Sequence, residues 1–331
     1  MVRGKRLAKT FDTKSEADAW RIEVSDNALQ EGRLHADAFG AVLQHWLAHI
    51  QATKDQNTFS AYDYAVQPFT KLGNVQAFSL RTINLQSVLD GLSGRTAQMA
   101  HDKIRQCVRW AIKMGMMASD PTEHLERPKH ERESIEVFTL AEIPRILEEA
   151  EHLKFHGAIL LALSCGLRGG EIWGLQWSDW KGNELSINRQ SAERSGIVQV
   201  KPPKRNSSRT IALPDSVVAA FEARNSARVR EGLAGCEWIF PDSRGNVTRR
   251  TNFAARTWKP LLKRAGVAAR GFHHCRHTAA SVLLNSGVPI TVVARILGHK
   301  DAATTLAIYA HLMTSELGVH RNVFDRVFGV A

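Results

Sequence analysis

Three short β-rich segments stand in the middle of a chain that otherwise shows helical periodicity. They span Glu184–Gln190, Ile197–Val200 and Arg209–Leu213, with turn residues between them. Short strands joined by turns usually pair antiparallel with their sequence neighbours. The sequence therefore predicts a three-stranded antiparallel sheet inside a helical domain, and a mainly α fold with a small antiparallel β-sheet (α+β).

Apolar residues at helical spacing predict helices on both sides of this β-rich region. Thr139 and Glu142 form a capping box, which marks a helix start. Gly287 and Gly298 are typical helix stops. The predicted helices of this part lie at about 140–150, 155–168, 275–286, 289–297 and 302–312.

The chain of 331 residues is long enough for two domains. Residues 1–36 form a short basic appendage, and residues 37–130 predict a bundle of four or five helices. A polar, proline-containing linker precedes the part that spans residues 131–318. Valines and phenylalanines recur every four residues in the tail, residues 319–331, so we expect the tail to dock on a neighbouring subunit.

The charge pattern indicates a polyanionic partner. The formal net charge is +11, and no carboxylate occurs between Asp242 and Asp301, a stretch that holds eleven lysines and arginines. Surface lysines added for solubility would account for the total charge, but they account less well for this gap in acidic residues. We therefore predict a surface that faces phosphates, with Arg249, Arg250 and Arg256 among its DNA contacts.

Cysteine usage and hydropathy predict a cytoplasmic protein that does not bind membranes. The four cysteines form no Cys-x-x-Cys pair, as expected in a reducing compartment. The first residues lack the apolar region of a signal peptide, and the longest apolar run, Ala158–Leu163, is too short to span a bilayer.

One set of polar residues fits metal-free phosphoryl transfer. Such a reaction needs a nucleophile, cations that hold the phosphate, and an acid for the leaving oxygen. Tyr309 is the only tyrosine after Tyr64, and it follows two arginines, a lysine and two or three histidines. The set in chain order is Arg168, Lys204, His273, Arg276, His299 and Tyr309.

Simpler interpretations exist for several of these residues. Arg168 could pair structurally with Glu171 one turn later, and Lys201 competes with Lys204 as the reactive lysine. The histidines and cysteine of residues 273–277 could bind zinc, but adjacent ligands suit a zinc site poorly, so we predict no metal and no cofactor. For His277 we expect a supporting role in packing or hydrogen bonding.

In order and spacing, these motifs resemble those of the tyrosine recombinases, or phage integrases. Gly166-Leu167-Arg168, followed by Glu171, is similar to the family's first signature box. His273-His274-Cys275-Arg276-His277, Leu297-Gly298-His299 and Tyr309 resemble the second, and Lys204 precedes a strand as the family's lysine does. The resemblance covers about residues 37–315. It departs from the family at Cys275, usually a leucine, and at the second glycine after Arg168.

The resemblance implies a role for each matching residue. Tyr309 would attack the scissile phosphate and form a 3′-phosphotyrosyl link, while Arg168 and Arg276 hold the non-bridging oxygens. His273 and His299 would hydrogen-bond the phosphate and assist proton transfer. Lys204 would protonate the leaving 5′ oxygen. Glu171 would orient Arg168, and Lys201 and Arg205 would contact DNA.

The resemblance also implies a domain plan and an activity. Residues 37–130 correspond to a core-DNA-binding domain and residues 131–318 to a mixed α/β catalytic domain. Four protomers would join two double-stranded recombination sites, with accessory DNA-bending proteins as further partners. The expected function is integration and excision of a mobile element at the nucleoid of a bacterial or phage-infected cell. Two alternatives stay open, a type IB-like topoisomerase and a catalytically silent architectural or regulatory DNA-binding protein.

Overall fold

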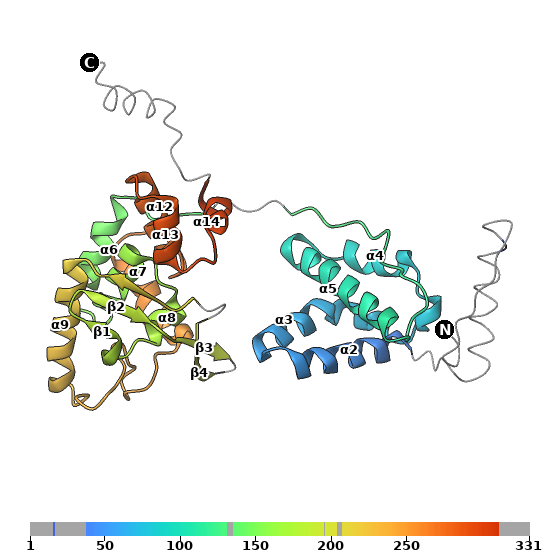
Figure 1. Ribbon diagram of the computed structural model, residues 1–331, viewed down its shortest axis with the longest axis horizontal. Coiled ribbons are helices and arrows are strands. Elements are labelled where there is room, and N and C mark those ends of the chain that lie inside the picture. Colours follow the sequence, from blue (N-terminus) through green and yellow to red (C-terminus); the bar gives the residue numbers. More distant parts are fainter. Residues whose placement is uncertain (1–15, 17–37, 131–134, 195, 204–206, 311–331) are drawn as a thin grey trace, which may run out of the picture. The chain divides into compact units, whose positions relative to one another are not determined.

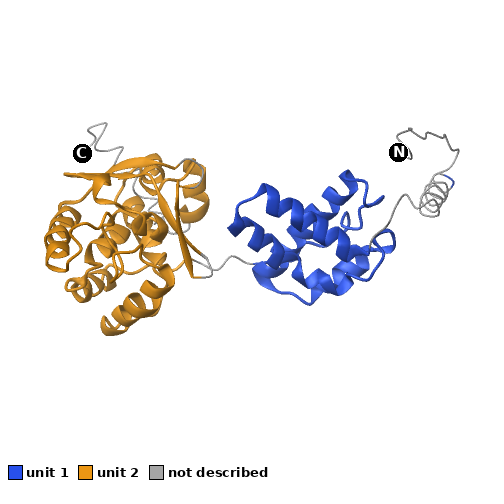
Figure 2. Ribbon diagram, turned by 90° about the horizontal axis from the view of Figure 1, so that it is seen from below, with its two compact units in different colours: residues 1–133 blue, residues 134–331 orange. Residues whose placement is uncertain are grey.

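The chain divides into two compact units, Met1–Glu133 and Ser134–Ala331 (Figure 2). The structure is a computed structural model that describes residue 16 and residues 38–130, 135–194, 196–203 and 207–310. The predicted subunit-docking tail and nearly all of the predicted basic appendage therefore lie outside the described residues.

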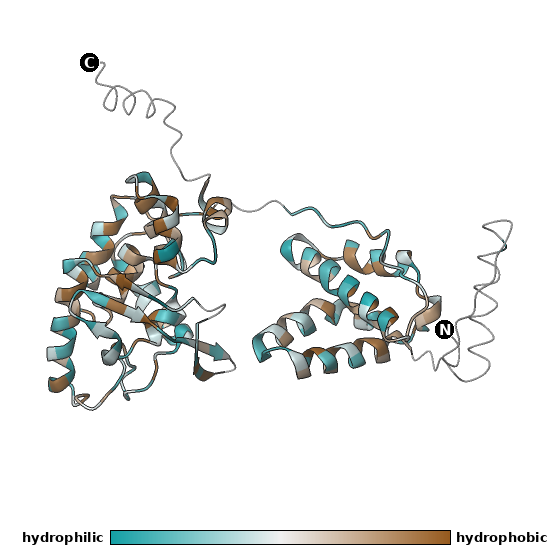
Figure 3. Cartoon of the chain, in the orientation of Figure 1, coloured by the Kyte–Doolittle hydropathy of each residue, from teal (hydrophilic) through white to brown (hydrophobic). Residues whose placement is uncertain are grey.

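The first unit is helical throughout its described part. Its helices carry both hydrophobic and hydrophilic residues (Figure 3). The hydrophobic residues form a core that includes Phe39, Trp46, Leu85 and Ile104. The ring centroids of Trp46 and Tyr62 lie 5.5 Å apart, so the first two helices contact each other through these rings. The elements are α2 (Phe39–Thr53), α3 (Gln56–Val66), η1 (Gln67–Leu72), η2 (Ala77–Ser79), α4 (Thr82–Asp90) and α5 (Gly94–Lys113).

The second unit combines helices with small sheets (Figure 1). The predicted capping box is confirmed, because the Thr139 amide donates to Glu142 Oε2 over 2.8 Å and the Glu142 amide donates to Thr139 Oγ1 over 3.2 Å. The helices are α6 (Glu142–Ala150), α7 (His156–Cys165), α8 (Gly169–Trp173), η3 (Trp177–Asp179), α9 (Asp215–Arg230), α10 (Arg250–Phe253), the π-helical turn η5 (Ala254–Trp258), α11 (Lys259–Arg264), α12 (His274–Asn285), α13 (Ile290–Leu297) and α14 (Ala302–Tyr309).

The strand pairing differs from the prediction. A three-stranded antiparallel sheet is present, in the order β1 (Trp180–Lys181), β2 (Glu184–Ile187) and β5 (Arg209–Ala212). The predicted strand at Ile197–Val200 does not join it. Instead β4 (Ile197–Lys201) pairs antiparallel with β3 (Gln190–Arg194) as a separate hairpin.

A turn at Gly196 explains this correction. Gly196 has φ +77°, a left-handed conformation that suits glycine and folds β4 back on the strand immediately before it. The strand that completes the sheet then comes from farther along the chain, and Ile211 of β5 lies opposite Leu185 of β2. The prediction of a mainly α fold with small antiparallel sheets is confirmed.

The predicted helix at 155–168 is shorter than expected. It ends at Cys165, because Gly166 adopts φ +64° and stops α7. Arg168 then takes the N-cap position of α8, and its backbone N–H donates to Glu171 Oε2 over 3.0 Å. The break places the Arg168 side chain at a helix start, where it is free of the buried face of α7.

Aromatic packing fixes α8 against the rest of the unit. Trp173 is buried, and its ring stacks on Phe272 with centroids 5.7 Å apart. Phe272 lies just before α12, so this contact joins the end of α8 to the start of α12. Within the described residues, every helix is too short or too polar to cross a bilayer.

Candidate active site

Three arginines from three elements converge on the C-terminal end of α13. Arg168 comes from the start of α8, Arg209 from β5 and Arg276 from α12. Each donates to one of three consecutive backbone carbonyls, which carry the negative end of the helix dipole. The bonds are Arg209 Nε to Ile296 O at 2.7 Å, Arg276 Nη2 to Leu297 O at 2.8 Å and Arg168 Nη2 to Gly298 O at 3.2 Å.

Glu171 joins two of these arginines. Arg168 Nη1 donates to its Oε1 over 2.8 Å, and Arg209 Nη2 donates to its Oε2 over 3.0 Å. Burial alone would raise the pKa of Glu171, but hydrogen bonds and charge from Arg209, with the charge of Arg168, hold that pKa below its ordinary value. The buried carboxylate is therefore ionised and orients both guanidinium groups.

Gly298 makes room for this arrangement. It caps α13 with φ +67°, and a Cβ atom at this position would lie 2.5 Å from Arg209 Nη1 and 2.8 Å from Arg209 Cζ. Both the backbone conformation and the contact with Arg209 therefore require glycine. Gly166 is similar, since a Cβ atom there would lie 2.5 Å from Leu297 Cδ2.

Arg276 is the most deeply buried of the three arginines, with 2% of the residue exposed. Its Nη1 donates to Gly166 O over 2.7 Å, so the same side chain links the end of α7 to the end of α13. Burial, and then the charge of Arg168, lower the pKa of Arg276 to about 10. Its guanidinium stays positive at neutral pH, with donors left for an anion.

The phenol of Tyr309 lies behind this cluster on α14. Asp301 caps the helix by accepting from the Thr304 amide over 2.7 Å. Thr305, on the same face as Tyr309, pairs its hydroxyl with His299 Nδ1 at 2.7 Å. The rings of His299 and Tyr309 are stacked with centroids 6.4 Å apart. Tyr309 is therefore packed between α12 and α13, with 1% of the residue exposed.

His277 contacts the Tyr309 hydroxyl directly. Its Nδ1 lies 3.0 Å from Tyr309 Oη. Burial raises the pKa of Tyr309, although the charges of Arg276 and Arg168 oppose that effect. Burial also lowers the pKa of His277 to about 4, with the charges of His274 and Arg276 adding to it. At neutral pH the phenol thus keeps its proton beside a neutral imidazole.

His273 and His299 are also neutral at neutral pH. Burial of its ring, then the charges of His277 and Arg276, lower the pKa of His273 to about 4, although the residue as a whole is exposed. Burial, then Arg276 and Arg168, lower that of His299 to about 4. A bound anion would offset the arginine charges and raise both pKa values.

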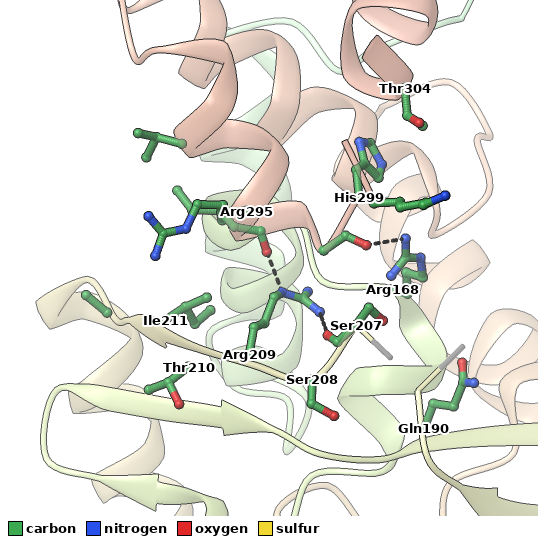
Figure 4. A pocket seen from close by; sticks show the side chains of 15 residues that line it. Arg168, Gln190, Ser207, Ser208, Arg209, Thr210, Ile211, Arg295, His299 and Thr304 are labelled. Carbon is green, nitrogen blue, oxygen red and sulfur yellow. Dashed lines mark hydrogen bonds between the residues drawn. The ribbon is translucent and has the colours of Figure 1, made fainter. Parts of the chain in front are cut away.

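A cavity of about 1050 Å³ opens beside the arginines (Figure 4). Arg168, Arg209 and His299 reach it, and Arg295 and Lys300 add exposed positive charge at its wall. The described residues that line it include no acidic side chain. The cavity is therefore suited to a phosphate group.

Comparison with known proteins agrees with this geometry. Residues 136–316, more than half of the chain, match the model of the phage integrase family. The chain belongs to the phage integrase family. The family prediction is thereby confirmed, and the chain is identified as a tyrosine recombinase.

Two relatives align along almost the whole length of this chain. A tyrosine recombinase XerC-like protein of Caldanaerobacter subterraneus is 28% identical, and the alignment covers 95% of this chain and 90% of the relative. An integrase of Streptomyces ambofaciens is 26% identical over 98% of this chain and 90% of its own.

Two solved structures show the same fold. The Tn1549 transposon integrase in complex with transposon right end DNA has a TM-score of 0.73 at 20% identity, covering 86% of this chain and 99% of that one. A lambda integrase tetramer bound to a Holliday junction has a TM-score of 0.63 at 18% identity, covering 91% and 89%.

The remaining predicted site residues lie elsewhere in the chain or outside its described residues. Lys204 and Arg205 fall in the second group. Lys201 ends β4 opposite Gln190, a residue that lines the cavity. Arg250 is exposed at the first residue of α10.

A second cavity, of about 840 Å³, carries the other predicted arginines. Arg249 and Arg256 line it together with Arg244 and Lys154, and Asp242 is the acid among its described lining residues. The three arginines are exposed, unlike those on α13. This basic depression is distinct from the cavity beside Arg168.

Two features of the candidate site did not follow from the sequence. Arg209 was not predicted as a site residue, although it shares the inward side of β5 with buried Ile211, where a charged residue calls for a buried partner. Cys275 is fully buried and points into the core. Among the described residues, no group of three histidine, cysteine or acidic side chains is arranged to hold a metal ion.

Proposed function

We propose that this tyrosine recombinase cuts and rejoins DNA at specific sites through a 3′-phosphotyrosyl intermediate formed on Tyr309, and that it integrates and excises a mobile element. The observation that carries the proposal is the grouping of Arg168, Arg276, His299 and Tyr309 around the end of α13, beside a cavity whose described lining lacks acids.

The arginines would bind the scissile phosphate. Two side-chain nitrogens of Arg276 and two of Arg168 donate hydrogen bonds to other protein groups, and each guanidinium has five N–H groups. The remaining donors suit the two non-bridging oxygens and the charge that grows on them in the transition state. His273 and His299 would add hydrogen bonds to the same group.

The phenol and a lysine would divide the chemical work. Tyr309 Oη would attack phosphorus, and the P–O5′ bond would break. Lys204 would protonate the leaving oxygen, with Lys201 as the alternative acid. Since the phosphotyrosyl bond keeps the energy of the phosphodiester, rejoining needs no nucleotide cofactor. We propose no resident metal.

The exposed arginines would hold the duplex in place. Arg249, Arg250 and Arg256 would contact backbone phosphates, with Arg205 near the lysine, and residues 37–130 would bind the core of the site. Four protomers would pair two sites, and strand exchange would proceed through a four-way DNA junction. DNA-bending proteins would assist, and the reaction would take place in the cytoplasm of the host cell. The tail, residues 319–331, would dock on the neighbouring protomer.

Covalent trapping tests this function. A random duplex library is first selected for binding to Tyr309→Phe, which keeps the fold but removes the nucleophile. Selected sites are then incubated with the wild type and with Tyr309→Phe in chelator, and the reactions are stopped in denaturant. We expect a protein–DNA adduct with the wild type alone.

Two other outcomes would overturn the proposal in different ways. Adduct formation with relaxation of supercoils, but without exchange between two sites, would indicate a topoisomerase. Tight binding without any adduct at selected sites would indicate an architectural or regulatory protein.

A further inference from the structure

His277 holds a position that its predicted supporting role does not explain. It follows Arg276 on α12, and its Nδ1 lies 3.0 Å from the hydroxyl of Tyr309. The two rings are 5.6 Å apart at their centroids. The hydroxyl in question belongs to the residue that the proposed function makes the nucleophile.

The protonation states on the two sides of this bond are matched for proton transfer. Burial raises the pKa of Tyr309, so the phenol needs an acceptor for its proton when it attacks at neutral pH. Burial and neighbouring positive charge lower the pKa of His277, so its imidazole is neutral at neutral pH. The negative charge of a bound phosphate would raise that pKa toward the range in which an imidazole accepts a proton.

Among the described residues, no other imidazole is hydrogen-bonded to the phenol. His299 Nδ1 pairs with the Thr305 hydroxyl at 2.7 Å, and His274 Nδ1 lies 2.9 Å from Gly271 O. Glu171 is held by Arg168 and Arg209. His273 faces His277 with ring centroids 4.8 Å apart, and Arg276 donates. Among the described residues, His277 is the imidazole hydrogen-bonded to the phenol.

We infer that His277 is the general base of strand cleavage and takes the proton of Tyr309 on Nδ1. The inference rests on the proposed function, since it assigns the first proton of that reaction. It requires the His277 tautomer that carries hydrogen on Nε2, so that Nδ1 is the acceptor.

The step balances in both directions. During cleavage the Oη–H bond breaks and the proton moves to His277 Nδ1, while the Oη–P bond forms and the P–O5′ bond breaks. The leaving 5′ oxygen takes its proton from the separate general acid, proposed as Lys204. During rejoining the 5′ hydroxyl returns its proton to that acid, and His277 returns its proton to the phenol.

The competing explanation is structural. A buried hydroxyl normally has a hydrogen-bond partner, and His277 could do no more than hold Tyr309 in place. His277→Asn separates the two roles, because the asparagine oxygen accepts a hydrogen bond near the Nδ1 position but does not take up a proton at neutral pH. His274→Asn is the matched control, since it makes the same change on α12 three residues earlier, about one helical turn away.

The experiment measures single-turnover adduct formation on saturating selected DNA between pH 6 and 9. A second substrate carries sulfur in place of the bridging 5′ oxygen, because a thiolate leaves without a proton. We expect His277→Asn to cut both substrates about 10²-fold more slowly than the wild type, a typical general-base contribution. We expect its rate to rise with pH as hydroxide replaces the base. Lys204→Ala should be restored by the sulfur substrate, and His274→Asn should behave as the wild type.

Specific results would overturn the inference. A His277→Asn rate within about threefold of the wild type, with the same pH profile, would leave His277 a positioning residue. Restoration of His277→Asn by the sulfur substrate would make His277 the acid and not the base. If His277→Asn fails to bind DNA, imidazole rescue of His277→Gly decides instead, and a lack of rescue counts against the base.

The proposed function fails in a distinguishable manner. If the wild type forms no adduct on selected DNA, the phosphotyrosyl mechanism is wrong whatever His277 does. If the wild type forms an adduct that Tyr309→Phe lacks, the mechanism stands, and the His277 variants then decide the base alone.

Discussion

Two groups of arginines in the second unit differ in what holds them. Arg168, Arg209 and Arg276 are buried or half-buried, and their guanidinium groups are bonded to the last carbonyls of α13. Arg249 and Arg256 are exposed around the second cavity. A guanidinium fixed before the substrate arrives contributes through its geometry, and a solvated one contributes through its charge. The same residue type is therefore expected to act on rate in one place and on affinity in the other.

The fixed group carries excess positive charge at some cost in stability. Among the described residues, Glu171 is the one carboxylate that forms ion pairs within this group, and it pairs with two of the three arginines. Carbonyls at a helix C-terminus compensate part of the lost hydration, but they do not neutralise the charge. A bound phosphate supplies the missing negative charge, so the free site is poised to bind one.

Arg276→Lys should give the largest effect. A lysine ammonium cannot span Gly166 O and Leu297 O while presenting a fork to phosphate, because its three donors radiate from one atom. We expect adduct formation to slow by about 10³-fold, with DNA affinity nearly retained. Single-turnover cleavage and a filter-binding titration measure the two quantities.

The exposed Arg256→Lys is the matched control and should cleave at the wild-type rate. If Arg276→Lys lost less than about tenfold, the claim that geometry distinguishes the two groups would be wrong.

Gly298→Ala should come next. The new Cβ atom would overlap Arg209, and the alanine would have to adopt a left-handed backbone conformation that it adopts poorly. We expect a loss of about 1–3 kcal/mol in unfolding free energy and a slower cleavage step, because Arg209 and then Arg168 would shift. Urea unfolding and adduct formation report both.

Gly182→Ala is a useful comparison for this variant. Gly182 also has positive φ, but open space surrounds the position of its Cβ atom. It should therefore lose stability without losing cleavage rate. Equal rate losses in the two variants would show that backbone strain, and not the displaced arginine, is responsible.

Stability of the second unit should fall with acidification from pH 7 to pH 5. The pKa values of His273, His277 and His299 are about 4 in the folded chain, against an ordinary value of 6.5. The unfolded chain thus binds protons first as pH falls through 6.5, which favours unfolding until the folded histidines titrate near 4. Each histidine contributes less than about 1.4 kcal/mol per pH unit, since all three are partly solvated.

Urea unfolding at pH 7, 6 and 5, followed by tryptophan fluorescence, measures this slope. His277→Asn should reduce it, and a polyanion bound at the site should also reduce it by raising the histidine pKa values. A slope unchanged in His277→Asn would mean that His277 is not held neutral.

The sequence predicted which residues lie together better than it predicted how they are connected. Arg168, Glu171, Arg276, His299 and Tyr309 were identified from motif spacing, and the structure brings them together. The binding of three arginines to the last carbonyls of α13 was not predictable. Every residue has a backbone carbonyl, and only tertiary packing brings the three arginines to the end of this helix. Local periodicity carries no such information.

The strands show the same limit. Ile197–Val200 was correctly expected to be extended, but it was assigned to the wrong sheet. The β-pattern gives the state of a segment, whereas the pairing partner depends on which turn closes first. Arg209 was missed for a related reason, since its role depends on Glu171, which lies in another element.

The smallest expected effects come from the exposed arginines, and they complete the comparison. Arg249→Ala and Arg256→Ala should each weaken DNA binding uniformly across sequences and reduce the salt dependence of log K by about one unit of slope. Cleavage of DNA that is already bound should change by less than about twofold. Arg230→Ala removes an exposed arginine from the end of α9 and controls for net charge. A slope equally reduced by Arg230→Ala would mean that total charge, and not this basic depression, meets the DNA backbone.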